Sequence, residues 1–350
     1  MPPRQGLKFT QLKKMKLQDF NYQLPAELIA QYPLPERDQA RLMVVDRTRE
    51  TIGHDIFERI GCYLPPESLV VVNDSKVIPA RLWGRREKTG GQVEIFLLKK
   101  LADGDSYQCL IRPLKRLKIG EKIILNSNGI YATLRDVPNR VVQFNTTNIE
   151  RHLNRLGSMP LPPYIKRPAE AQDQRFYQTV YARHPGSVAA PTAGLHFSKA
   201  LLKELNAAGH PIISVTLHIN HATFKPVQEE DITRHKMHSE DYHITQKAYR
   251  TLHNAHDRKL PIVAVGTTSC RVLETIARNQ NLKGSTDIFI YPGYQFRMTD
   301  ILVTNFHLPL STLLMLVYAF GGMPLMKKVY VEAIKEKYRF YSYGDAMMII

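Results

Sequence analysis

The stretch Leu69-Val70-Val71-Val72-Asn73-Asp74-Ser75-Lys76 decides the fold class of this chain. Its first four residues are all leucine or valine, which is typical of a strand buried on both faces, and it continues into a polar Asn-Asp turn. The apolar run 262–265 has the same character and leads into Gly266-Thr267-Thr268-Ser269, the expected start of a helix. Strands and helices that alternate in this way predict a layered α/β domain with a mixed sheet.

Further elements are expected on both sides of this strand. Ser198 is the predicted N-cap of one helix, with Gly209 as its C-terminal stop, and Asp55 is the predicted N-cap of another. The predicted helices span residues 24–31, 55–63, 198–208, 246–257, 266–278, 311–320 and 324–337. The predicted strands span residues 42–46, 69–72, 212–217, 262–265, 288–290 and 346–350.

Residues 79–146 follow a different pattern, in which short segments of strand composition are separated in several places by glycine. Closely spaced strands with turn signals predict a small all-β barrel. We therefore expect a β-barrel domain, 79–146, inserted into a discontinuous α/β catalytic domain made of 1–78 and 147–350. Residues 1–16 are expected to be a flexible tail, or an extension upstream of a natural start at Met15.

The composition favours a polyanionic partner. Lysine and arginine total 48 against 32 aspartates and glutamates, a formal net charge of +16, and the barrel segment alone carries 13 basic against 6 acidic residues. Because neutralising phosphates releases condensed counterions, this excess favours nucleic acid. Three cysteines without a CxxC pair argue against disulfides and thiolate zinc sites, and predict a cytoplasmic protein. No run approaches the roughly 20 apolar residues of a membrane span.

Several standard catalytic motifs are missing. The chain has no GxGxxG, no GxxxxGK[ST] and no GxSxG, so neither a common nucleotide-phosphate cradle nor a nucleophile elbow is expected. His235, His238, Glu240 and His243 form a cluster in the sequence, but their spacing matches no HExxH pattern. We expect no metal there; the alternative to a metal site is a set of polar residues that orient a loop or a substrate.

Other stretches are dense in small and polar residues. Asp74 follows a buried strand, where it would either contact a ribose or act as a base, or else cap the turn. His196 lies in Ala190-Pro191-Thr192-Ala193-Gly194-Leu195-His196-Phe197. Histidine titrates near neutrality, so His196 is a candidate for proton transfer, although in isolation the stretch favours a tight turn before Ser198. The hydroxyls and backbone N–H groups of 266–269, supported by Arg271, suit an anionic group.

Taken together, these motifs resemble the S-adenosylmethionine:tRNA ribosyltransferase-isomerase family of queuosine biosynthesis. The resemblance runs from about Leu17 to Ile350. It is carried by LPAELIAQYPLPERDQARLMVVDR, NDSKVIPARL, GGQVEIFLL, PLPPYIKR, AAPTAGLHF, TLH, HKMHSED, VAVGTTSCRVLE, TDIFIYPGYQF, TNFHLPLSTLLMLV and RFYSYGDAMM.

The resemblance implies an α/β domain with an inserted barrel, and a reaction at the wobble position of a tRNA that bears 7-aminomethyl-7-deazaguanine. S-adenosylmethionine is expected to be consumed as a co-substrate that donates its ribosyl group, with no recycled cofactor and no metal. The products would be epoxyqueuosine-tRNA, adenine and methionine. A monomer without membrane contact is expected.

We assign expected roles to positions within these motifs and within the basic barrel segment. The expected catalytic residues are His196, His218, His307 and Asp74. The expected substrate-binding residues are Thr192, Gly194, Phe197, Thr223, His238, Glu240, Thr267, Thr268, Arg271, Tyr291 and Tyr294. The expected RNA contacts are Arg85, Arg86, Lys115, Arg116 and Lys118. Among these, Thr267, Thr268 and Arg271 suit a methionine carboxylate, whereas Phe197, Tyr291 and Tyr294 suit flat rings.

Two departures from the family pattern stand out. Asn220-His221-Ala222 replaces a Gly-rich stretch, so the shape of this loop is expected to differ, because alanine does not favour the positive φ that glycine allows. Leu310 stands where lysine is common in the family. Two other functions remain open from the sequence: a non-catalytic tRNA-binding protein, and a metal-dependent hydrolase that uses His235, His238 and His243.

Overall fold

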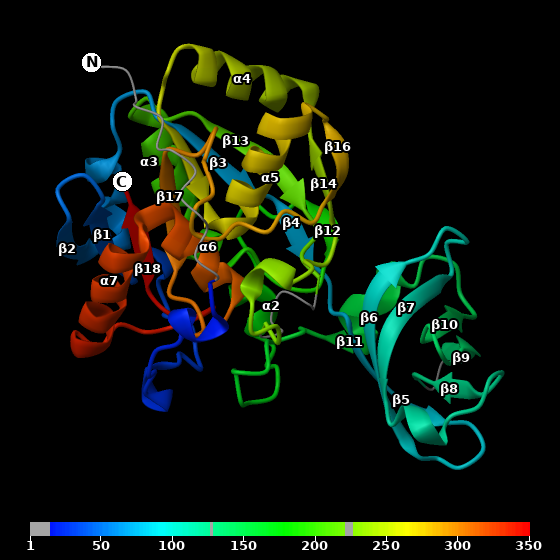
Figure 1. Ribbon diagram of the computed structural model, residues 1–350. Coiled ribbons are helices and arrows are strands. Elements are labelled where there is room, and N and C mark those ends of the chain that lie inside the picture. Colours follow the sequence, from blue (N-terminus) through cyan, green and yellow to red (C-terminus); the bar gives the residue numbers. More distant parts are fainter. Residues whose placement is uncertain (1–14, 127–128, 221–226) are drawn as a thin grey trace.

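The computed structural model describes residues 15–126, 129–220 and 227–350. Within these residues, nine strands form one mixed sheet in the order β16-β14-β13-β3-β15-β17-β18-β1-β2 (Figure 1). The strands are β1 Arg41–Asp46, β2 Thr51–Ile56, β3 Leu69–Asn73, β13 Ile212–Leu217, β14 Glu240–Ile244, β15 Ile262–Val265, β16 Lys283–Thr286, β17 Ile301–Asn305 and β18 Ala346–Ile349. The four strands β13, β3, β15 and β17 at its centre are parallel, as their apolar sequences require.

Helices cover both faces of this sheet because alternate strand residues point to opposite sides. Val71 and Ala264 belong to a core that also contains residues of α4 Gln246–Asp257, α5 Gly266–Asn279, α6 Thr312–Gly321 and α7 Met323–Lys335. Val70 and Val263 face the opposite side, where α3 Lys199–Ala207 and the 3-10 helix η4 Phe57–Tyr63 pack. The predicted layered α/β architecture is therefore confirmed.

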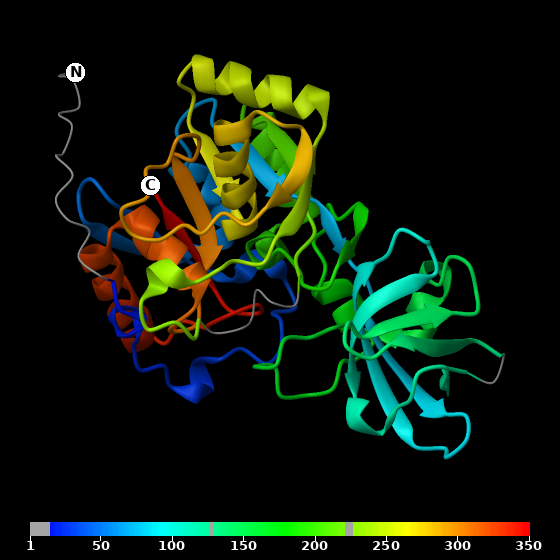
Figure 2. The ribbon, with the colours of Figure 1, turned by 45° about the vertical axis from the view of Figure 1, so that its right-hand side comes forward.

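The second sheet closes into a barrel. Its described strands run in the order β11-β5-β6-β7-β10-β9-β8, and an additional pairing of β5 with β8 closes the ring. The strands are β5 Arg81–Arg86, β6 Gln92–Lys100, β7 Ser106–Arg112, β8 Lys122–Ile124, β9 Tyr131–Asp136, β10 Val141–Phe144 and β11 Gly157–Ser158. Figure 2 shows the barrel beside the α/β part. The predicted β-barrel is present, and β11 extends its sheet past residue 146.

Two short strands lead from the α/β sheet toward the barrel. β4 Ser75–Val77 follows β3 directly and pairs in parallel with β12 His184–Ser187. Helix α1 Glu150–Leu156 precedes β11, and α2 Asp173–Phe176 lies farther along the same connection.

Two predicted elements and one predicted helix cap are wrong. Residues 24–31 contain only the 3-10 turn η2 Ala26–Leu28, because Pro25 and Pro33 leave too little chain for a helix. The helix predicted over 55–63 is present as the 3-10 helix η4, but Asp55 lies in β2 instead of capping it, and its carboxylate accepts hydrogen bonds from the Ile56 N–H and the Tyr63 hydroxyl. Residues 288–290 form no strand, since the edge strand that pairs with β14 is β16.

No single helix among the described residues is long and apolar enough to cross a bilayer. Helices α6 and α7 reach that length and composition only as a pair, and they are bent by 115°. Most of the expected tail lies outside the described residues. Its last residue, Lys16, pairs with Asp231 through the backbone as an isolated antiparallel β-bridge.

Candidate functional site

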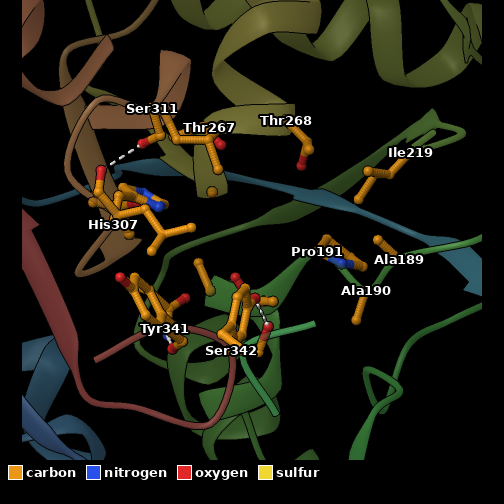
Figure 3. Close-up of a pocket in the computed structure, with 18 residues that line it drawn as sticks. Ala189, Ala190, Pro191, Ile219, Thr267, Thr268, His307, Ser311, Tyr341 and Ser342 are labelled. Carbon is orange, nitrogen blue, oxygen red and sulfur yellow. Dashed lines mark hydrogen bonds between the residues drawn. The ribbon is translucent and has the colours of Figure 1, made fainter. Parts of the chain in front are cut away.

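A hollow of about 680 Å³ lies where β15 and β17 end and α5 begins. The carboxyl ends of parallel strands are the usual place for a ligand in such a sheet. The lining residues are Tyr164, Ala189, Ala190, Pro191, Thr192, Ala193, Ile219, Gly266, Thr267, Thr268, Thr304, Asn305, His307, Leu308, Ser311, Leu313, Tyr341 and Ser342. Figure 3 shows threonines from the start of α5 on one side and Tyr341 and Ser342 on the other. We call this hollow the strand-end pocket.

The start of α5 forms one wall of the pocket. Gly266 has φ +88, a conformation that favours glycine, and a Cβ there would lie 3.6 Å from that of Ala193. The Thr268 hydroxyl is buried and has no hydrogen-bond partner among the described residues. The first turn of a helix also leaves backbone N–H groups unpaired and carries partial positive charge. This wall is therefore suited to a carboxylate or a phosphate.

Asn305, at the end of β17, lines the pocket and carries an acceptor that is unpaired among the described residues. Its side-chain nitrogen lies 3.0 Å from His196 Nε2 and 3.1 Å from the Tyr341 carbonyl, and since an amide nitrogen only donates, both partners must accept. These contacts fix the orientation of the amide. The Asn305 side chain is buried, with the residue only 1% exposed, and its Oδ1 has no hydrogen-bond partner within the described structure. A ligand that donates a hydrogen bond would satisfy it.

His196 lies behind Asn305 and does not line the strand-end pocket. Its ring is 4% exposed and packs 5.1 Å from that of Phe57. Burial, followed by repulsion from Arg339 and Arg37, lowers the pKa of His196 to about 3. The imidazole is therefore neutral, with its proton on Nδ1, because Nε2 accepts from Asn305. The structure places His196 as a support for Asn305, and the prediction that it transfers protons in the site is not supported by this geometry.

His307 does line the pocket. Its Nε2 lies 2.7 Å from the Thr304 hydroxyl, whereas Nδ1 has no hydrogen-bond partner among the described residues. Burial lowers the pKa of His307 to about 3, so the imidazole is neutral. Its backbone is held by two tyrosines: the His307 N–H donates to the Tyr330 hydroxyl, and the Tyr22 hydroxyl donates to the His307 carbonyl.

Two aromatic rings form the wall opposite α5. The rings of Tyr164 and Tyr341 lie 4.6 Å apart, and the hydroxyls of Tyr164 and Ser342 are 2.7 Å apart. Tyr341 has φ +70, which turns the chain so that consecutive side chains Tyr341 and Ser342 both reach the pocket. Burial raises the pKa of Tyr341, so its hydroxyl stays protonated. These faces are suited to a cation or a flat ring.

His218 and Asp74, which were predicted to be catalytic, belong to a different cluster. Asp74 accepts from the Thr216 hydroxyl at 2.7 Å and lies 3.8 Å from His184. His218 packs against Gly186, where a Cβ would lie 2.9 Å from its Nδ1. Its neighbour Ile219 faces the strand-end pocket instead. The structure therefore brings only His307 of the four predicted catalytic residues to the pocket.

The predicted anion contact at Arg271 is not part of the pocket wall. Arg271 and Glu240 form a buried ion pair, and Glu240 also accepts a hydrogen bond from the Asn220 N–H at 2.8 Å. The pair therefore holds the backbone at Asn220. Glu240 acts with Arg271 in this arrangement and not at the pocket surface.

The remaining predicted substrate contacts divide into three groups. Thr192, Thr267 and Thr268 line the pocket. Gly194 and Phe197 are structural: a Cβ at Gly194 would lie 1.9 Å from the Tyr181 hydroxyl, and Phe197 is buried against Phe57. The others lie away from the pocket or outside the description: Tyr294 donates to Glu274, Tyr291 packs on Phe289, His238 is exposed, and Thr223 is outside the described residues together with His221 and Ala222.

In the described ranges, no group of three or more His, Cys, Asp or Glu is arranged to hold a metal ion. His235 packs against the Phe289 ring at 5.3 Å, and His243 is exposed on β14. The predicted RNA contacts all lie on the barrel. Arg85, Lys115, Arg116 and Lys118 are exposed, whereas Arg86 is paired with Glu121.

Several pocket residues escaped sequence reasoning. Asn305, Tyr164, Tyr341 and Ser342 were not predicted as site residues, although all of them lie within the motifs TNFHLPLSTLLMLV, PLPPYIKR and RFYSYGDAMM. Their membership of those motifs was the available signal. Residue type alone did not separate Tyr164 and Tyr341 from Tyr291 and Tyr294, which were predicted instead.

Comparisons with known proteins agree with one another. Residues 17–349 match the family described as queuosine biosynthesis protein. Proteins named S-adenosylmethionine:tRNA ribosyltransferase-isomerase are 48% identical over 337 residues in Sulfurihydrogenibium sp. and 49% identical over 344 residues in Symbiobacterium thermophilum, each covering 96% of this chain and all of the relative. The crystal structure of S-adenosylmethionine tRNA ribosyltransferase from Thermotoga maritima is 37% identical, with a TM-score of 0.56, and covers 95% of this chain and 100% of that one.

Proposed function

This chain belongs to the S-adenosylmethionine:tRNA ribosyltransferase-isomerase family of queuosine biosynthesis, and we propose that it catalyses that reaction in the strand-end pocket. The donor is S-adenosylmethionine. The acceptor is the aminomethyl group of 7-aminomethyl-7-deazaguanine at the wobble position of a tRNA. The products are epoxyqueuosine-tRNA, adenine and methionine, and the protein works in the cytoplasm.

The observation that carries the proposal is the pairing of an anion-binding wall with an unpaired acceptor in one pocket. The start of α5 with Thr268 would bind the methionine carboxylate. Asn305 Oδ1 would accept a hydrogen bond from the exocyclic amine of adenine. The faces of Tyr164 and Tyr341 would stabilise the sulfonium between these two ends.

His307 would act as the general base of the first step. The sulfonium acidifies the adjacent ribose C5′, and the His307 imidazole, in the tautomer whose Nε2–H donates to the Thr304 hydroxyl, would take the proton from this carbon at its unpaired Nδ1. The bond between ribose and adenine then breaks, and adenine takes up a proton as it leaves. The amine of the tRNA base attacks the ribosyl carbon and loses a proton. Rearrangement of the ring gives the epoxycyclopentane, and methionine leaves as a neutral thioether.

The test combines the intact protein with S-adenosylmethionine and precursor-bearing tRNA. Free adenine is quantified by chromatography and the modified nucleoside by mass spectrometry. We expect both products in equal amounts. The appearance of neither product, in a preparation shown to bind S-adenosylmethionine and tRNA, would overturn the proposal and indicate a non-catalytic tRNA-binding protein.

His307→Gln separates the role of the base from that of binding. Glutamine can retain a polar contact to Thr304 but cannot serve as the base, so the single-turnover rate should fall by about 10²–10⁴-fold with S-adenosylmethionine binding retained. His256→Gln, on the exposed end of α4, is the matched control. An unchanged rate in His307→Gln would remove His307 from the mechanism.

A further inference from the structure

The outer face of the barrel carries an exposed aromatic ring among arginines. Arg81, Trp83 and Arg85 alternate along β5, so all three point to the same side, and Glu94 and Arg112 follow across β6 and β7 in register with Trp83. Trp83 is the only tryptophan of the chain and is 48% exposed. We call these five residues the tryptophan face.

A groove of about 580 Å³ adjoins the tryptophan face. Arg81, Glu94 and Arg112 belong to both the face and the groove, and the groove is completed on the barrel by Phe96 and Leu110. Its other side is the segment 160–163 together with Val188, which come from the connection to the α/β part. The groove therefore lies at the junction of the barrel with the rest of the chain.

The tryptophan face carries a net positive charge. Three guanidinium groups stand against the single carboxylate of Glu94, which lies 3.3 Å from Arg81. Arg81 is paired with Glu94 through its Nε, and Arg85 donates to the Gly90 carbonyl, whereas the Arg112 side chain has neither a hydrogen bond nor an ion pair among the described residues. The face thus has spare donors in the fork geometry that matches phosphate oxygens.

The groove and the strand-end pocket share a wall. Pro163 lines the groove and the next residue, Tyr164, lines the pocket; likewise Val188 lines the groove and Ala189 lines the pocket. In two separate segments the chain therefore passes from one hollow to the other within a single residue. The groove and the pocket are therefore neighbouring hollows that border the same two chain segments.

We propose that the tryptophan face and its groove bind single-stranded nucleotides of the RNA next to the base that enters the strand-end pocket, with a base stacked on Trp83 and phosphates on Arg81 and Arg112. This inference rests on the proposed function for the identity of the RNA as an anticodon loop. An exposed aromatic ring among arginines recognises unstacked bases and their backbone, which a double helix does not offer.

Trp83 provides its own assay, because it is the only tryptophan. The intact protein is titrated with an RNA hairpin of anticodon stem-loop sequence while tryptophan emission is recorded. We expect saturable quenching that weakens as salt rises, and much weaker quenching by a fully paired duplex of equal length. Emission that does not change while the hairpin binds, as measured by filter binding, would overturn the proposal.

Substitutions test the stacking and the phosphate contacts separately. Trp83→Ala should weaken hairpin binding roughly 5- to 100-fold, whereas Trp83→Phe should keep most of the affinity of the parent chain. Arg112→Ala should lower the salt slope of binding by about one. The matched control is Arg135→Ala, since Arg135 is exposed on β9 of the same barrel and paired with Gln143. Equal hairpin affinity for Trp83→Ala, Arg135→Ala and the parent chain would contradict the assignment.

These tests of RNA binding can be separated from tests of the proposed reaction. S-adenosylmethionine binding, measured by calorimetry, should be unaffected in Trp83→Ala, because Trp83 does not line the strand-end pocket. If quenching and the loss on Trp83→Ala are observed while no adenine is ever released, the RNA surface stands and the proposed reaction fails. If adenine is released normally by Trp83→Ala at low RNA concentration, the reaction stands and the RNA surface is wrong.

Discussion

Replacing either buried histidine by glutamine should flatten the acid branch of the stability curve. His196 and His307 are 4% and 8% exposed, and burial lowers the pKa of each from 6.5 to about 3. Between pH 6.5 and pH 3 the unfolded chain binds a proton at each ring that the folded chain does not bind. The free energy of unfolding therefore rises with pH through this window, and it falls when the solution is acidified.

The size of the effect follows from one proton per ring. Each histidine contributes a slope of at most about 1.4 kcal/mol per pH unit, so that acidification from pH 6.5 to pH 4.5 costs roughly 2–3 kcal/mol per ring. Both rings together would remove about 5 kcal/mol, a large part of the ~5–15 kcal/mol that holds a typical domain folded. Glutamine can retain a polar contact to Asn305 or to Thr304 but takes up no proton.

The measurement is urea unfolding followed by far-ultraviolet circular dichroism between pH 5 and pH 6, a range chosen because few carboxylates titrate there. Each glutamine variant should lower the slope of unfolding free energy against pH by about 1.2 kcal/mol per pH unit. His256→Gln is the control, because its side chain is in water before and after unfolding. A slope in His196→Gln or His307→Gln equal to that of the parent chain would refute the burial argument for that ring.

Two further predictions concern residues around the pocket. Gly194→Ala should lower the free energy of unfolding by about 1–3 kcal/mol, because the new Cβ would lie 1.9 Å from the Tyr181 hydroxyl. Tyr181→Phe removes a buried hydroxyl that has no partner in the described structure, so it should be nearly neutral alone and should recover part of the loss; strictly additive effects in denaturant unfolding would be inconsistent with this contact. Asn305→Leu should weaken S-adenosylmethionine binding by roughly 5- to 100-fold in calorimetry, through the lost acceptor. An analogue with purine in place of adenine lacks the donating amine, so its affinity should change little on this substitution; an equal loss for both ligands would assign Asn305 another role.

The fold could be predicted because strands buried on both faces consist almost entirely of aliphatic residues, which can be recognised in the sequence. The all-aliphatic runs of β3 and β15 indicated a sheet covered on both sides, and the helix 246–257 matches α4 at both ends. One error arose where local hydrogen bonds determine the secondary structure. Asp55 had the residue type of a helix cap, yet its carboxylate binds the neighbouring Ile56 N–H and the Tyr63 hydroxyl instead.

The pocket could be predicted only in part. Thr267, Thr268 and His307 follow the ends of neighbouring parallel strands, and topology brings such residues together. His218 failed because residues alternate in direction at the end of β13, so Ile219 faces the pocket while His218 faces Gly186. Tyr341 and Ser342 depend on a positive φ at a tyrosine, which no residue pattern announces.

The attachment of the barrel limits how it can move. Its two connecting segments are hydrogen-bonded to each other, with Gly157 opposite Leu82 and Ser158 opposite Arg81, and a Cβ at Gly157 would lie 2.0 Å from the Pro79 carbonyl oxygen. A single tether would allow the barrel to swivel, whereas a paired ribbon in close backbone contact resists twisting. With RNA in the groove as we propose, this attachment would keep the span from groove to pocket constant. The protein would then select its target nucleotide at a fixed length along the RNA from the point where the loop is bound.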